Sequence, residues 1–196
     1  MLEHYIRPAY QRILVDPLAQ SLARYTRVSA NQLTLFSGVL APFILLALWF
    51  HHPAVALGFL LLSGYLDTLD GTLARFRSET SEQGSVLDIV CDRVVELSVF
   101  LGLYLYAPDT RALACLAMLG SSYLCITSFL VVGIFTQNES QKSFHYSPGL
   151  MERGEAFIFF VLMIAAPFLF QPLAWAYTLL VLWTAGYRVY EFMVAN

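Results

Sequence analysis

Charged residues are scarce in this sequence. Asp, Glu, Lys and Arg together make up 13% of the 196 residues, whereas hydrophobic residues make up 58% and the mean hydropathy is +0.64. Soluble domains carry about a quarter charged residues and about half apolar ones, so the composition excludes an ordinary water-soluble enzyme. The formal net charge is -3, which leaves no basic field to attract nucleic acid. The length fits a single domain, residues 1–196.

Cysteine is scarce as well. Cys91, Cys115 and Cys125 lie inside apolar runs, and their spacing matches neither a metal-binding pattern nor a disulfide framework. The sequence has no internal repeat, and no apolar core of the signal-peptide type lies before residue 30. These absences leave the long hydrophobic runs as the dominant feature.

The hydrophobic residues gather in stretches long enough to cross a membrane. The predicted spans are Leu33–Phe50, Ala54–Leu73, Ser85–Ala107, Ala112–Thr136, Glu155–Phe170 and Leu173–Val194. Only Gln171-Pro172 separates the last two, which predicts a tight helical hairpin. The expected fold is an all-α integral membrane protein, with residues 29–196 forming a bundle of six transmembrane helices.

Residues 1–28 have the pattern of an amphipathic juxtamembrane helix lying in the membrane interface. The apolar positions at near-helical spacing are Tyr5, Tyr10, Leu14, Leu18, Leu22 and Tyr25. Ser29 and Gln32 have capping-box spacing and are expected to start the first span. With six spans, one side of the membrane carries Arg7, Arg12, Arg24, Arg27, Arg75, Arg77, Lys142 and Arg153. The positive-inside rule therefore places both termini in the cytoplasm, as in a bacterial-type inner membrane.

Four aspartates interrupt segments that otherwise read as spans. A carboxylate at the centre of a span costs roughly 2.5–3.5 kcal/mol, so four facing lipid would be prohibitive. Asp67 and Asp70 share one helical face, as do Asp88 and Asp92. The short link Phe76–Gln83 makes the two helices antiparallel neighbours, so the pairs can converge. Clustered hard oxygen ligands suit Mg²⁺, Mn²⁺ or Ca²⁺, and two divalent ions would balance four negative charges.

Small residues and one arginine flank the acidic positions. Gly71, Ala74 and Gly84 each lie one helical turn from an aspartate, which leaves room for a bulky ligand near the backbone. Arg75 follows Asp67 by eight residues on nearly the same face, where a guanidinium would bind a phosphate. Carboxylates, metal ions, space and an arginine together predict a site for phosphoryl chemistry.

The spacing resembles the signature of the CDP-alcohol phosphotransferase family at every fixed position: Asp67-x-x-Asp70-Gly71-x-x-Ala74-Arg75-x(8)-Gly84-x-x-x-Asp88-x-x-x-Asp92. The resemblance implies six transmembrane helices, an interfacial amino-terminal helix, a homodimer and a site that opens to the cytoplasm. It also implies a reaction in which an alcohol hydroxyl attacks the phosphorus of a CDP-linked donor and CMP leaves.

The resemblance implies a role for each matching residue. Asp67, Asp70 and Asp88 are expected to bind Mg²⁺ or Mn²⁺, as two ions, and Asp92 is expected to act as general base and to touch a metal. The expected CDP-binding residues are Gly71, Ala74, Arg75 and Gly84, together with Asn31 and Thr34. The last two come from Asn31-Gln-Leu-Thr34, which resembles the family's Asn-x-Leu-Thr stretch except that Ala30 stands where proline is common.

The sequence defines the alcohol acceptor less closely than the CDP-linked donor. Glu152-Arg153-Gly154-Glu155 resembles a stretch of several bacterial members, and Arg153 and Arg188 match two arginines that hold an acceptor phosphate in relatives making phosphatidylinositol phosphate. Those relatives carry basic residues where this chain has Phe129-Leu-Val-Val-Gly133. Glycerol 3-phosphate, inositol and inositol phosphate therefore stay open as acceptors, with CDP-diacylglycerol as the expected donor. Residues 137–147, including Lys142, are positioned to cap the acceptor pocket.

Other interpretations use the same residues. A divalent-cation transporter would also carry intramembrane carboxylates, but it would leave Gly71, Ala74 and Arg75 unexplained. An intramembrane prenyltransferase uses two acidic clusters with Mg²⁺, at a different aspartate spacing. An arginine near a helix end, such as Arg153 or Arg188, also reaches the membrane interface without any ligand.

Overall fold

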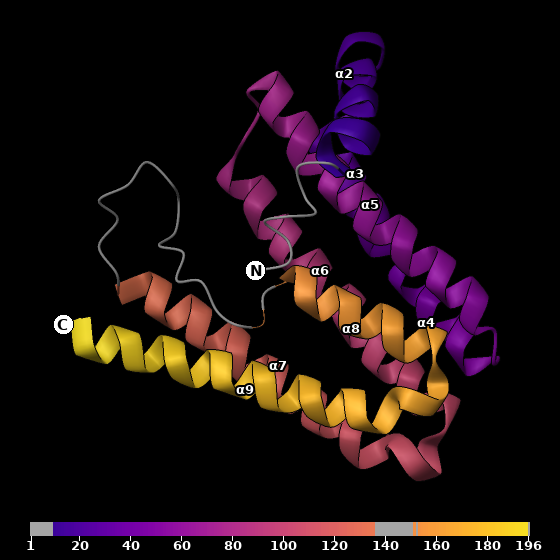
Figure 1. The fold of residues 1–196 in the computed structure, drawn as a ribbon. Helices are drawn as coiled ribbons and strands as arrows, with labels where there is room; N and C mark the ends of the chain where they lie inside the picture. Colours follow the sequence, from indigo (N-terminus) through magenta and orange to yellow (C-terminus); the bar gives the residue numbers. More distant parts are fainter. Residues whose placement is uncertain (1–9, 136–150, 152, 196) are drawn as a thin grey trace. The chain divides into compact units, whose positions relative to one another are not determined.

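The computed structural model describes residues 10–135, 151 and 153–195, and every regular element within these ranges is a helix (Figure 1). The chain divides into two compact units, Met1–Tyr106 and Ala107–Asn196. Four predicted features lie outside the described residues: Tyr5, Arg7, Glu152 and the proposed cap at residues 137–147 with Lys142.

Within the part of the chain that the structure describes, four helical stretches are long and apolar enough to cross a membrane, so the protein is an integral membrane protein. They are Ala30–Trp49, Pro53–Arg77, Pro108–Phe135 and Pro167–Val194. Helices also occupy the other two predicted spans: α6 (Glu82–Tyr106), which contains charged residues, and α8 (Arg153–Ala165), which has 13 residues. A bundle of six spans stays a prediction.

The first predicted span consists of two helices, α3 (Ala30–Val39) and α4 (Ala41–Trp49). The predicted capping box is confirmed, because Ser29 and Gln32 exchange side-chain and backbone hydrogen bonds at the start of α3. The interruption at Leu40 precedes Pro42, which has no N–H to donate to the preceding turn. A proline in the first turn of α4 avoids that loss.

In the first unit, α3 and α4 pack against both α5 (Pro53–Arg77) and α6. Gly102 of α6 permits the close approach to α4, since a Cβ atom there would lie 2.7 Å from Leu48 Cδ1. The helix α5 ends at Ser78, whose φ of 55° places it in the left-handed conformation. The antiparallel neighbours predicted from the short link therefore have α3 and α4 as their common packing surface.

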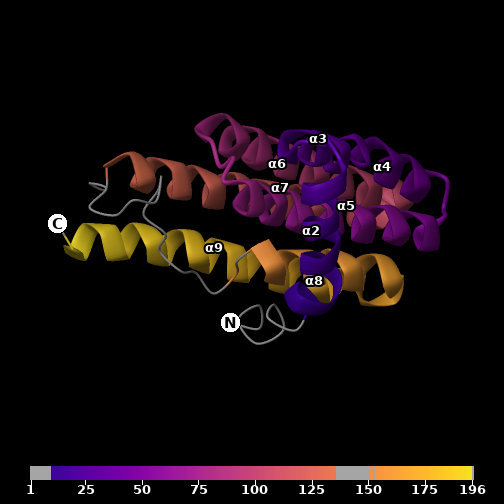
Figure 2. The ribbon, with the colours of Figure 1, turned by 90° about the horizontal axis from the view of Figure 1, so that it is seen from above.

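The amino-terminal segment forms a π-helix, η1 (Gln11–Val15), followed by α2 (Asp16–Tyr25). Val15 and Ala19 are fully buried in a cluster with Leu69 and Leu73 of α5, and α2 runs across the direction of α3, α4 and α5 (Figure 2). The predicted apolar stripe is divided: Tyr10 and Leu22 pack against this cluster, whereas Leu14, Leu18 and Tyr25 are exposed.

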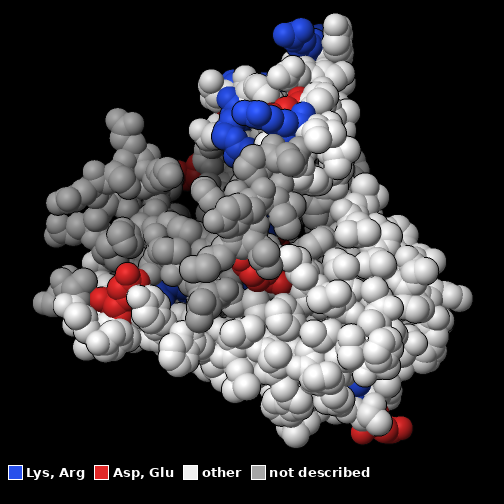
Figure 3. Space-filling view, in the orientation of Figure 1, with Lys and Arg blue, Asp and Glu red and all other residues white. Residues whose placement is uncertain are grey.

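The surface of the first unit is unevenly charged. Figure 3 shows Lys and Arg atoms gathered near α2, whereas the surface near α4 carries almost none. The exposed arginines of the α2 region are Arg12, Arg24 and Arg27. Apolar side chains of α4 such as Phe43 and Trp49 are exposed beside that uncharged surface, as expected for a face in contact with lipid.

The second unit contains α7 (Pro108–Phe135), α8, the 3-10 helix η2 (Pro167–Leu169) and α9 (Phe170–Ala195). Both α7 and α8 pack against α9. The turn of the predicted hairpin lies at residues 166–169, and Gln171-Pro172 belongs to the first turn of α9, so the predicted turn position is wrong. Ala166 leaves the helical conformation (φ -127°, ψ 75°) because it precedes Pro167.

Candidate active site

Three of the four predicted aspartates converge in the first unit. Asp67 and Asp70 of α5 and Asp88 of α6 each offer a carboxylate oxygen, and these oxygens lie within 4.8 Å of one another. Asp70 is buried, with 6% of its surface exposed, while Asp67 and Asp88 are half-buried. Asp92 lies one helical turn beyond Asp88 and is also half-buried, and its contact with a metal stays a prediction.

The three carboxylates fit a divalent cation. Like charges this close repel one another, and a buried carboxylate needs a compensating positive charge or hydrogen bonds. Carboxylate oxygens are the ligands that Mg²⁺ and Mn²⁺ prefer. An ion bound by Asp67, Asp70 and Asp88 would remove the repulsion.

The start of α3 contacts both sides of the acidic cluster. The Thr34 hydroxyl lies 2.5 Å from Asp70 Oδ2 and is buried. One turn earlier, the amide of Asn31 lies beside α6, since a Cβ atom at Gly84 would stand 3.1 Å from Asn31 Oδ1. Two pairs of predicted residues are thus brought together, and their contact with a nucleotide stays a prediction.

Arg75 turns back along α5 toward the small residues. A Cβ atom at Gly71 would lie 3.5 Å from Arg75 Nη1, and Nη2 donates a hydrogen bond to the Thr72 hydroxyl at 3.0 Å. The Arg75 side chain is exposed, and Ala74 beside it is half-buried. An exposed guanidinium over a glycine suits an anion that approaches the helix backbone.

Sequence reasoning missed two contributors near this site and the structural role of a third residue, Arg77. Gln11 and Thr72 join the Arg75 contact by hydrogen bonds, and no local pattern indicates that residue 11 would reach residue 72. Arg77, one turn beyond Ala74, donates to the backbone carbonyl groups of Leu22, Thr26 and Val28. It therefore fastens the linker between α2 and α3, a role that a positive charge near a membrane does not reveal.

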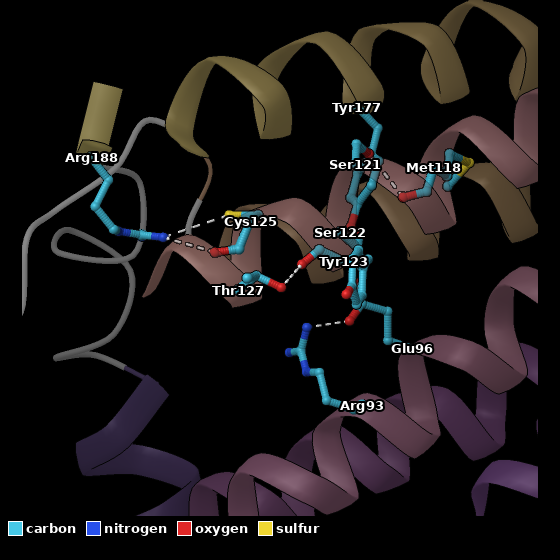
Figure 4. A network of polar contacts seen from close by, with 10 residues as sticks. All are labelled: Arg93, Glu96, Met118, Ser121, Ser122, Tyr123, Cys125, Thr127, Tyr177 and Arg188. Carbon is cyan, nitrogen blue, oxygen red and sulfur yellow. Dashed lines mark hydrogen bonds and ion pairs between the residues drawn. The ribbon is translucent and has the colours of Figure 1, made fainter. Parts of the chain in front are cut away.

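The two predicted acceptor residues lie in the second unit. Arg188 of α9 directs Nη1 at the Cys125 carbonyl oxygen at 3.1 Å (Figure 4). The same Nη1 lies 3.2 Å from Ser128 Oγ, and the guanidinium lies over the Phe129 ring at 5.3 Å. Its Nε atom is buried and has no hydrogen-bond partner among the described residues. Arg153 is the exposed first residue of α8. Acceptor binding by either arginine stays a prediction.

Two further polar pairs are visible in Figure 4. In the second unit, the buried Ser122 and Tyr177 hydroxyls lie 2.8 Å apart and connect α7 to α9. In the first unit, Arg93 forms an ion pair with Glu96 on α6, as its spacing suggests. These contacts account for charged or polar groups inside apolar helices.

Comparisons with known proteins identify the class. The sequence profile described as CDP-alcohol phosphatidyltransferase matches residues 27–189. The chain belongs to this family. It is therefore a transferase of phospholipid biosynthesis, and the resemblance found in the aspartate signature is confirmed.

Relatives within the family span most of the chain. The inner membrane protein YnjF of Escherichia coli is 34% identical over 95% of this chain and 96% of its own length. The phosphatidylinositol phosphate synthase of Corynebacterium glutamicum is 28% identical over 79% of this chain and 69% of its own.

This chain shares its fold with an enzyme of known structure. The phosphatidylinositol phosphate synthase of Mycobacterium tuberculosis, in complex with manganese and citrate, superposes with a TM-score of 0.75 at 20% identity, covering 90% of this chain and 88% of that one. With CDP-diacylglycerol bound, the same enzyme gives a TM-score of 0.73 at 21% identity, covering 90% and 92%.

Proposed function

We propose that the protein transfers a phosphatidyl group from CDP-diacylglycerol to the hydroxyl of inositol phosphate and releases CMP. The observation that carries the transfer chemistry is the convergence of Asp67, Asp70 and Asp88, with oxygens within 4.8 Å. The donor and acceptor are supported by the names of the relatives, which include phosphatidylinositol phosphate synthases and a structure with CDP-diacylglycerol bound.

Asp67, Asp70 and Asp88, with Asp92, would hold two ions of Mg²⁺ or Mn²⁺, which would screen the charge of the donor diphosphate and of the departing CMP. Manganese in the related solved enzyme supports this choice. Because three carboxylates already lie together, little rearrangement is needed to bind the cation.

The donor would lie against α5, α3 and α6. Arg75 binds the diphosphate through its guanidinium fork, and Gly71 and Ala74 leave space for close approach to α5. Asn31, Thr34 and Gly84 complete the CDP-binding surface.

Asp92 is the proposed general base. It accepts the proton of the attacking hydroxyl while a new oxygen–phosphorus bond forms and the bond to the CMP oxygen breaks. An aspartate beside cations is a weak base, so its main contribution is to align the hydroxyl with the phosphorus.

Arg153 and Arg188 would bind the phosphate of the acceptor. A glycerol 3-phosphate acceptor offers the same phosphate on a smaller alcohol. Residues 129–133 are apolar where relatives that make phosphatidylinositol phosphate carry basic residues, and this difference favours an acceptor that needs fewer basic contacts. Free inositol carries no phosphate and would need no basic contact. These alcohols are therefore the comparison acceptors.

We further propose a single domain of six spans, assembled as a homodimer, with both termini and the active site facing the cytoplasm. The exposed Leu14, Leu18 and Tyr25 support an interfacial position for the amino-terminal helices, because they would contact lipid. Arg12 and Arg24 on the same segment would face phospholipid headgroups.

The decisive experiment is CMP release by purified protein with CDP-diacylglycerol and Mg²⁺ or Mn²⁺. The acceptors are inositol phosphate, glycerol 3-phosphate, inositol and serine, with Asp92→Asn as the blank and a chelator as the metal control. We expect release with inositol phosphate that the chelator abolishes and Mn²⁺ restores. Stimulation by glycerol 3-phosphate or inositol alone would replace the acceptor, and Mn²⁺ uptake into vesicles without CMP release would favour a transporter.

A further inference from the structure

Thr72 is the centre of a hydrogen-bond network beside the acidic cluster. Its side chain is buried, with 3% of its surface exposed. The hydroxyl donates to the Thr68 carbonyl oxygen at 2.9 Å and accepts from Arg75 Nη2 at 3.0 Å and from Gln11 Nε2 at 2.7 Å. A hydroxyl has one hydrogen to donate and two lone pairs to accept with, so all its hydrogen-bonding capacity is used.

Gln11 ties this network to the amino-terminal segment. Its Nε2 also donates to Asp16 Oδ1 at 3.0 Å, so both amide hydrogens have acceptors. Its Oε1 is buried and has no hydrogen-bond partner among the residues that the structure describes. Burying an unpaired oxygen costs free energy that an apolar side chain would avoid, so the advantage of glutamine here lies in the two bonds from its nitrogen.

The network acts on the orientation of Arg75. An exposed arginine samples many rotamers, and each immobilised side chain costs binding free energy when a ligand arrives. Here one guanidinium nitrogen lies over Gly71 and the other is held by Thr72. The guanidinium is thus fixed over the small-residue face of α5 before any anion binds.

We infer that Thr72 and Gln11 are positioning residues for the donor: they hold Arg75 in the orientation that binds the diphosphate of the CDP group. This inference rests on the proposed function for the identity of the ligand. It adds that the amino-terminal segment contributes to donor affinity through Gln11, rather than serving only as a membrane anchor.

The test replaces the Thr72 hydroxyl by a methyl group. Thr72→Val keeps the shape and removes the acceptor for both Arg75 and Gln11, and Thr72→Ser keeps the acceptor. Gln11→Leu removes only the outer part of the network. Thr178→Val is the matched control, because Thr178 is also buried and its hydroxyl also bonds to a carbonyl oxygen one turn back, of Ala174.

Two quantities are measured on the full-length protein. The first is the dissociation constant of CDP in the presence of Mn²⁺, which needs no acceptor. The second is the pair of KM values for CDP-diacylglycerol and for the acceptor that the wild-type protein uses. Thermal unfolding of each variant reports whether it is folded.

We expect Thr72→Val to weaken CDP binding and raise the donor KM about three- to tenfold, with an acceptor KM within about twofold of wild type. Gln11→Leu should give a smaller shift in the same direction, about two- to threefold, and Thr72→Ser and Thr178→Val should match wild type. Equal loss in both KM values, or wild-type CDP affinity in folded Thr72→Val and Gln11→Leu, would overturn the inference.

The CDP measurement separates this inference from the proposed function. A wild-type protein that binds CDP but releases no CMP with any acceptor would refute the proposed reaction, while the variants would still test the network. A wild-type protein that binds no CDP would refute both.

Discussion

The contact between Thr34 and Asp70 predicts that a residue outside the three-carboxylate cluster controls metal affinity. Both side chains are buried, with 4% and 6% of their surfaces exposed, and the hydroxyl lies 2.5 Å from the carboxylate oxygen. In Thr34→Val a methyl group replaces the hydroxyl and cannot donate a hydrogen bond. Asp70 then keeps its oxygens and its backbone hydrogen bond with Gly71 but loses the side-chain contact that helps to fix their direction.

Two effects of Thr34→Val oppose each other. Without the hydroxyl, the carboxylate is a stronger electron donor to a cation, which favours binding. It is also less restrained against rotation away from Asp67 and Asp88, which disfavours binding. Removing a group that hydrogen-bonds to a metal ligand lowers metal affinity about 10–100-fold. A hydrogen bond to a charged group contributes about 1.5–3 kcal/mol. We therefore expect orientation to dominate and Mn²⁺ to bind about 10–100-fold more weakly.

The assay is titration of Mn²⁺ into purified protein, with free Mn²⁺ followed by electron paramagnetic resonance. Thr34→Ser should retain the wild-type affinity because it keeps the hydroxyl. Thr178→Val controls for loss of a buried threonine hydroxyl, since each of the two hydroxyls also lies within hydrogen-bond distance of the carbonyl oxygen one turn back. Wild-type or tighter Mn²⁺ binding by folded Thr34→Val would refute the reasoning.

Three further substitutions follow from the packing. Gly102→Ala should destabilise the protein by about 1–3 kcal/mol and lower its unfolding temperature, because the new methyl group would stand 2.7 Å from a buried leucine methyl of α4. Gly120→Ala is the control, because Gly120 has open space around it and its substitution should leave the unfolding temperature unchanged. Equal unfolding temperatures of the two variants would contradict the packing. Arg77→Gln should speed limited proteolysis between α2 and α3, since three carbonyl contacts are lost, and an unchanged cleavage pattern would count against that role. Gly84→Ala should raise the donor KM about two- to fivefold through its contact with Asn31; a changed acceptor KM instead would remove Gly84 from the CDP site.

Much of the site could be predicted because its determinants are local. The three- and four-residue separations of the aspartates place each pair on one face of any helix they join. The same regularity places Gly71 and Arg75 together, and the structure confirms this pairing. The capping box at Ser29 and Gln32 is equally local and is confirmed.

Other predictions failed or fell short where a local pattern was ambiguous. The turn between the last two helices lies at residues 166–169 because Pro167 forces Ala166 out of the helical conformation. Pro172, chosen from the same kind of signal, is accommodated within the first turn of α9, where a missing N–H costs nothing. Both prolines are compatible with a boundary, and the local sequence pattern does not distinguish them.

The sequence by itself determined the hydrophobic runs, the all-helical class and the faces on which the aspartates lie, because these depend on the helical repeat and on the cost of charge in lipid. Only the tertiary structure decided that α3 packs against both α5 and α6, which brings Thr34 to Asp70 and Asn31 to Gly84. It also decided that Gln11 reaches Thr72 across 61 residues. Contacts of that kind depend on which helix surfaces meet, and helix periodicity contains no information about the partner.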